Sequence, residues 1–120
     1  MSLIPRTFEE IMQYNVPPTD LYESNDAYKI EMALPGVTKD AIEVEADFEH
    51  MDIVVKLPEE EETEKKFLLR ERTCGRKFLR QVSFKRHVDP QKAELQLHDG
   101  VLTIIVPKAP AAQKVKLQLN

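Results

Sequence analysis

The sequence predicts an all-β protein, an antiparallel β-sandwich formed by a single domain. Three observations lead to this prediction: short segments of alternating apolar and polar residues recur along the chain, turn residues separate them, and no helical pattern of normal length occurs. The 120 residues are enough for one hydrophobic core and too few for two ordinary domains.

The first half of the chain contains a short arm and then strand-like segments. Residues 3–14 have apolar side chains at helical spacing, but the stretch is too short to hold a helix without packing, and Pro17 and Pro18 end it. TDLY then leads into AYKIEMA, an alternating strand that the Pro35-Gly36 turn closes. AIEVEA and MDIVVKL repeat the alternation, so we expect a strand in each.

The second half supplies the remaining strands. The charged run 58–66 is predicted to be a solvated loop, and strands are expected in FLLRERT, KFLRQVSF, AELQL and VLTIIV. Asp99-Gly100 marks a tight hairpin turn between the last two, because such turns need positive φ angles. VLTIIV is apolar on both faces, so its second face needs a cover of its own.

Composition is typical of a globular protein and excludes several classes. Hydrophobic residues make up 42% and charged residues 32%. No apolar run approaches the roughly 20 residues of a membrane span, and the N-terminus lacks a signal-peptide pattern, so we expect a cytoplasmic protein. The net charge of -4 argues against bulk attraction to nucleic acid or anionic membranes. Cys74 cannot form an internal disulfide and is interpreted as a reduced thiol, although it could join two chains.

The end of the chain differs from the rest. PKAPAAQ reads as an extended linker, and KVKLQLN after it has its aliphatic residues Val115, Leu117 and Leu119 on one face of a predicted strand. A lone amphipathic strand needs a partner, and the sandwich has surplus apolar surface. We therefore expect strand addition, in which the tail docks on another chain; the alternative is that it folds back onto its own sheet.

The motifs from Pro18 to Lys108 resemble those of the alpha-crystallin domain of small heat-shock proteins. PTDLYESNDAYKIEMALPGVTKDAIEV is similar to the opening of that family, RERTCGRKFLRQVSF to its E-R-x-x-G-x-F-x-R-x-F signature, and DGVLTIIVPK to its G-V-L motif. The resemblance implies an immunoglobulin-like sandwich over residues 17–108, an N-terminal arm over 1–16 and a C-terminal extension over 109–120. The chain departs from the family at Leu95, where a smaller alanine is usual.

The resemblance also implies contact residues. A groove would take the tail motif Val115, Leu117 and Leu119 of a neighbouring chain, and its residues would be Ile42, Val44, Ala46, Leu95 and Leu97. A strand-exchanged dimer would use Thr19, Asp20, Leu21, Tyr22, Phe67, Leu68, Leu69, Arg70 and Arg80. The arm would bind clients through Leu3, Ile4, Phe8, Ile11 and Met12.

Two further implications concern contacts of Arg80 and of the segment VLTIIV. Arg80 shares a strand face with apolar residues and therefore needs an acceptor; we expect a carboxylate or carbonyls at the dimer interface, the alternative being that it reaches solvent. VLTIIV would be an inner strand, covered on its second face by the N-terminal arm or by another subunit.

The implied function is ATP-independent holding of unfolding proteins by a homodimer or higher oligomer, with ATP-driven chaperones as candidate downstream partners. No enzyme, cofactor or metal is expected, because no phosphate-binding loop or nucleophile motif occurs and His50, His87 and His98 lack metal-ligand spacing. Neither nucleic acid nor a membrane is an expected partner. Two alternatives stay open: a monomeric CS-domain-like co-chaperone or adaptor, and a single-strand nucleic-acid binder that uses the basic, phenylalanine-containing segment 65–86.

Overall fold

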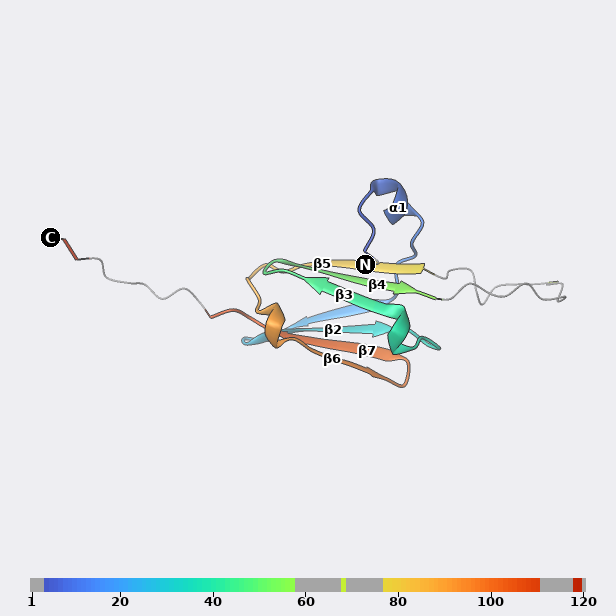
Figure 1. Ribbon diagram of the computed structural model, residues 1–120. Coiled ribbons are helices and arrows are strands. Elements are labelled where there is room, and N and C mark those ends of the chain that lie inside the picture. The colour runs from blue at the N-terminus through green and yellow to red at the C-terminus, as the bar shows by residue number, and fades with distance from the viewer. Residues whose placement is uncertain (1–3, 58–67, 69–76, 111–117, 120) are drawn as a thin grey trace.

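The computed structural model describes residues 4–57, 68, 77–110 and 118–119. Within these residues the chain forms two antiparallel sheets that pack as two layers (Figure 1). The four-stranded sheet has the order β1-β2-β7-β6, with bounds Thr19–Glu23, Ala27–Ala33, Val101–Pro107 and Glu94–His98. The three-stranded sheet has the order β3-β4-β5, with bounds Ile42–Ala46, His50–Lys56 and Lys77–Ser83. The predicted all-β sandwich is confirmed.

Three short helical segments accompany the strands in the described part of the chain. The arm contains α1 (Phe8–Met12), and two 3-10 turns, η1 (Lys39–Ala41) and η2 (Pro90–Lys92), lead directly into β3 and β6. FLLRERT lies outside the described residues, as does all of the tail apart from 118–119. The strands predicted there stay predictions.

The core lies between the two sheets and follows the alternation of the sequence. In β2 every second residue is buried, and Ile30 and Met32 have no exposed surface. Ile53 of β4 and Ile104 of β7 meet them from the opposite sheet and the neighbouring strand, and both are fully buried. Because side chains of a strand point to opposite faces in turn, one face of each of these strands faces the core.

Strand β7 is an inner strand, paired with β2 on one side and β6 on the other. Leu102, Ile104 and Val106 are buried in the core, while Val101 and Ile105 on the outer face are each 38% exposed. The inner position is as the resemblance implied. The described part of the arm does not cover the outer face, because it lies beside the other sheet; only the second possibility, another subunit, remains a prediction.

The arm is held against β5 by main-chain hydrogen bonds. Asn15 donates to the carbonyl of Lys77 at 2.9 Å and accepts from the N–H of Leu79 at 2.8 Å, which makes a parallel bridge to Phe78. This contact carries α1 to the outside of the three-stranded sheet (Figure 1). A capping box starts α1: Thr7 accepts from the N–H of Glu10 at 3.1 Å, and the Glu10 carboxylate accepts from the N–H of Arg6 at 2.7 Å and of Thr7 at 3.4 Å. These main-chain donors lower the pKa of Glu10.

The hairpin between β6 and β7 has the positive φ angles that its sequence predicts. Asp99 has φ 50° and Gly100 has φ 76°. The Gly100 carbonyl accepts from the N–H of Leu34 at 2.7 Å, so this turn sits against the Leu34–Pro35 turn of the neighbouring strand.

Substitution of the two turn glycines should separate backbone strain from crowding. Gly36 and Gly100 have nearly equal φ angles of +77° and +76°, but a Cβ on Gly100 would lie 3.2 Å from the Cα of Pro35, whereas one on Gly36 meets nothing within 4 Å. We expect Gly36→Ala to lower the free energy of unfolding by about 1 kcal/mol and Gly100→Ala by about 2 kcal/mol or more. Urea unfolding measures both values. Equal losses of unfolding free energy in the two variants would show that the Asp99-Gly100 turn can move away from Pro35 without cost.

Candidate functional site

The most distinctive surface of the described chain is an apolar groove between the two sheets. Strands β3 and β6 are the edge strands of their sheets, and the groove runs between them. Its volume is about 320 Å³. The two 3-10 turns place these edges, because η1 leads directly into β3 and η2 into β6.

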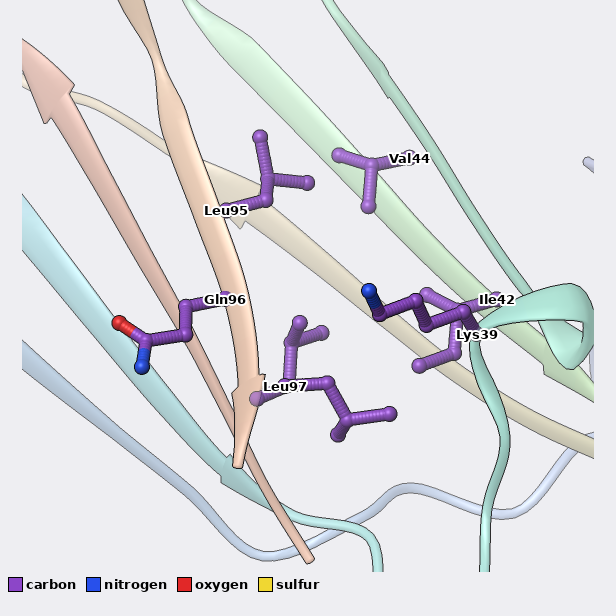
Figure 2. A pocket seen from close by; sticks show the side chains of 7 residues that line it. Lys39, Ile42, Val44, Leu95, Gln96 and Leu97 are labelled. Carbon is purple, nitrogen blue, oxygen red and sulfur yellow. The ribbon is translucent and has the colours of Figure 1, made fainter.

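Four aliphatic residues from two strands face one another across this groove. Ile42 and Val44 come from β3, and Leu95 and Leu97 come from β6 (Figure 2). Leu102 of β7 also contributes to the lining. Leu95 lies opposite Val44, while Leu97 lies on the side of Ile42. The fold therefore brings together four of the five groove residues predicted from the sequence, Ile42, Val44, Leu95 and Leu97, although their role in docking stays a prediction.

Ala46 is the predicted groove residue that lies elsewhere. It is exposed and is not among the residues that line the groove. The register explains this: Leu95 already faces Val44, and β6 begins at Glu94, so the wall opposite β3 ends before Ala46 is reached.

Lys39 is a groove residue that the sequence did not reveal. It belongs to η1, and its side chain lies beside Ile42 in Figure 2. A lysine in a turn carries no pattern that predicts such a place. The groove thus has aliphatic residues on both walls, a cation beside Ile42, and Gln96 at its border.

The spacing of the groove residues suits an extended segment. Each wall uses residues two positions apart, and residues two apart in a strand are about 6.6 Å apart on the same face. An incoming strand with aliphatic side chains at positions i and i+2 would meet both pairs. Leu95 is 51% exposed, so a large part of this apolar surface is accessible in the single chain.

Four of the predicted dimer residues, Thr19, Asp20, Leu21 and Tyr22, lie on β1, at the other edge of the four-stranded sheet. Among the described residues β1 pairs only with β2, and Leu21 and Tyr22 are each 49% exposed. Thr19 is half-buried and Asp20 is exposed. Leu68 is 95% exposed, and Phe67, Leu69 and Arg70 lie outside the described residues. Exchange of strands between subunits therefore stays a prediction.

Arg80 finds its acceptors within its own chain. Its Nε donates to the hydroxyl of Thr19 at 3.1 Å, and its Nη2 donates to the carbonyl of Pro17 at 2.9 Å. The side chain is half-buried, so the alternative that it merely reaches solvent is wrong. The expected carbonyl acceptor is present, but it belongs to Pro17 of the same chain, so the contact ties the residue that follows the arm to β5. A backbone carbonyl 63 positions away gives no sequence signal.

The arm residues divide into covered and accessible ones. Phe8 is 75% exposed and Met12 is 67% exposed, whereas Ile4 and Ile11 are half-buried. Ile11 lines a shallow cavity together with Tyr14 and Leu79 of β5. Leu3 lies outside the described residues. The sequence did not predict that the arm would both cover part of β5 and present two large apolar side chains.

Titratable side chains in the described segments do not gather into a chemical site. Groups of three or more histidine, cysteine or acidic residues placed to hold a metal are absent there. His50, His87 and His98 each lie beside a different carboxylate, of Asp47 at 3.5 Å, Glu49 at 2.9 Å and Asp99 at 3.1 Å. Likewise, a helix that is long and apolar enough to cross a membrane does not occur in the described segments. Much of the basic segment 65–86 lies outside them.

Comparison with known proteins gives a consistent result over nearly the whole chain. The family model of the Hsp20/alpha crystallin family matches residues 20–118. Small heat shock protein C4 of Rickettsia felis is 34% identical over 107 residues, which cover 87% of this chain and 64% of that protein. The 17.7 kDa class II heat shock protein of Arabidopsis thaliana is 31% identical over 102 residues, covering 82% of this chain and 65% of that protein. The chain thus spans less than two thirds of the length of these two relatives.

Solved structures of small heat-shock proteins are similar in fold to this chain. A small heat-shock protein from Xylella fastidiosa superposes with a TM-score of 0.71 at 27% identity, over 90% of this chain and 98% of that one. Heat shock protein 16.0 from Schizosaccharomyces pombe gives a TM-score of 0.69 at 28% identity, over 88% of this chain and 98% of that one. The two-layer fold and its edge groove therefore lie in a segment that corresponds to these proteins.

Proposed function

The chain belongs to the Hsp20/alpha crystallin family, and from this premise we propose that it is an ATP-independent holdase, which binds non-native proteins and prevents their aggregation. Membership supports a chaperone role and a protein that is not an enzyme. Members of this family form oligomers and bind client proteins.

The observation that carries the proposal is the accessible apolar groove between β3 and β6. Unfolding proteins expose apolar side chains and unpaired strand edges, which associate with one another unless something covers them. A groove lined by Ile42, Val44, Leu95 and Leu97 offers such segments both an aliphatic surface and strand edges. Burial of apolar surface has no directional requirement, so many different clients would fit.

We assign the resting occupant of this groove to the tail of a second copy of the chain. Burying a valine or leucine side chain contributes about 1.5–3 kcal/mol as an upper value. Association costs at least about 4 kcal/mol, so two or three such residues give a weak contact that opens readily. Repetition of the contact through an oligomer makes the assembly firm while each groove still opens.

The other parts of the proposal follow from this assembly. Residues 17–108 act as the sandwich domain, residues 1–16 as the arm and residues 109–120 as the extension. The building block is a strand-exchanged homodimer in the cytoplasm, and Phe8 and Met12 of the arm give clients a second apolar surface. ATP-driven chaperones would receive the held clients.

The tail provides the test of this proposal. We expect the variant Val115→Ala, Leu117→Ala, Leu119→Ala to fall to dimers by native mass spectrometry, because it loses about 2 kcal/mol or more of aliphatic burial at every contact. A matched control, Lys116→Ala with Gln118→Ala, changes the opposite face of the same predicted strand and should assemble like the parent. Light scattering of a heat-unfolding enzyme, without ATP, is recorded in parallel.

Two results would decide against the proposal. If neither the parent nor the variants affect scattering, holding is not the function of this protein, and the adaptor and nucleic-acid alternatives gain weight. If the triple variant assembles like the parent, the tail is not the link between subunits.

A further inference from the structure

Lys108 is a half-buried residue at the point where the chain leaves the sandwich, and its side chain is the more covered part. Its side chain is only 7% exposed, whereas that of Lys92 is 73% exposed. The ammonium Nζ donates to the carbonyl of Ser24 at 2.7 Å and lies 3.5 Å from a carboxylate oxygen of Glu23. It also lies over the Tyr28 ring, 5.1 Å from the ring centroid, and the face of an aromatic ring attracts a cation at this distance. A lysine that served only for solubility would extend its ammonium into water.

The main chain around Lys108 is fixed as firmly as its side chain. The N–H of Lys108 donates to the carbonyl of Asp26 at 2.8 Å, and Lys108 forms an antiparallel bridge with Val88. The N–H of Ala109 donates to the carbonyl of His87 at 2.8 Å. Pro110 then restricts Ala109 to extended conformations. The chain end is thus held from two sides, by the turn between β1 and β2 and by the loop after β5.

We infer that Lys108 is a positioning residue, which fixes the direction in which the chain leaves the sandwich and thereby the neighbouring subunit whose groove the tail motif reaches. In Figure 1 the described chain leaves at the end of β7, away from the Asp99-Gly100 turn. The contacts of the ammonium on Ser24, Glu23 and Tyr28 hold that exit against the first hairpin.

Few residues separate Lys108 from the tail motif, so the direction in which the chain leaves the sandwich limits which grooves the motif can reach. Val115 follows Lys108 by seven positions, and seven residues span at most about 25 Å. With so short a tether, the effective concentration of the tail at a given groove depends strongly on the starting direction. This inference rests on the proposed docking of the tail on a second copy.

The test compares Lys108→Met with Lys92→Met in the full chain. Methionine keeps an unbranched apolar stem and removes the charge and the donors. We expect Lys108→Met to exchange subunits roughly tenfold faster than the parent and to give a broader mass distribution by native mass spectrometry. Lys92→Met should behave like the parent. With each substitution placed in the Val115→Ala, Leu117→Ala, Leu119→Ala background, whose tail no longer competes for the groove, a fluorescent peptide of residues 113–120 should bind with one affinity throughout, because the groove is untouched.

Each outcome has a definite meaning. A folded Lys108→Met protein with the exchange rate and mass distribution of the parent overturns the inference while the proposed function stands. Failure of the peptide to bind the Val115→Ala, Leu117→Ala, Leu119→Ala variant, whose groove lacks a competing tail, overturns both. If Lys108→Met gives no cooperative thermal transition, Glu23→Gln decides, since it removes one partner of the ammonium at the surface: faster exchange supports the inference, and unchanged exchange overturns it.

Discussion

Replacing Leu95 with glutamate is expected to abolish docking of the tail while leaving the fold intact. Leu95 lines the groove and is 51% exposed, so a carboxylate there stays hydrated as long as the groove is empty. An aliphatic tail would have to strip water from that charge, which costs at least about 2 kcal/mol and weakens binding about 30-fold or more. Fluorescence anisotropy of a labelled peptide of residues 113–120 measures the affinity, and native mass spectrometry should show loss of the higher assemblies.

Gln96→Glu is the matched control for this substitution. It adds the same charge one residue further along β6; Gln96 also borders the groove, but its side chain points away from Val44 and Ile42 (Figure 2). We expect its affinity for the peptide to stay close to that of the parent. Unchanged binding by Leu95→Glu, or an equal loss in both variants, would contradict the assignment of this groove as the tail site.

Replacing Ile104 with alanine should produce the largest loss of stability among single substitutions considered for β7. Ile104 is fully buried between Ile30 of β2 and Leu95 of β6. Removing its outer carbon atoms leaves a cavity in the core, and the free energy of unfolding should fall by about 3–4 kcal/mol. Urea unfolding at one fixed protein concentration measures the change, because assembly makes stability depend on concentration.

Ile105→Ala is the companion variant, with the same atoms removed from the next residue of the strand. Ile105 points to the outer face and is 38% exposed, so the expected loss is about 1 kcal/mol or less. If Ile105→Ala costs as much as Ile104→Ala, another subunit buries the outer face of β7 in the assembled protein. The comparison of the two variants therefore tests whether another subunit covers the outer face of β7.

The strands and their core faces could be predicted because their signal is local. In β2 the alternation of Tyr28, Ile30 and Met32 with polar or small residues matches the period of a strand, and burial follows it residue by residue. Positive φ angles at Asp99 and Gly100 could be predicted because Asp-Gly supplies them at little cost. The groove could be anticipated from the resemblance, which named two strands whose edges the fold brings together.

The features that the sequence did not reveal depend on main-chain groups and long-range packing. Asn15 bridges to Phe78 through backbone hydrogen bonds, which any residue except proline could make at that position, so no pattern marks the docking of the arm. The acceptors of Arg80 and Lys108 include the carbonyls of Pro17 and Ser24, and a carbonyl is present at every position of a chain. Lys39 lies in the groove because it belongs to η1, the turn that precedes the edge strand β3.

In the proposed function one groove holds the tail at rest and unfolding clients under stress, so clients should displace the tail from it. The labelled peptide of residues 113–120 is bound to the parent protein, without ATP, and an enzyme is added and heated through its unfolding transition. The proposal predicts that anisotropy falls as the enzyme unfolds and that the native enzyme has no effect. Suppressed aggregation with the peptide still fully bound would contradict it, because clients would then be held elsewhere.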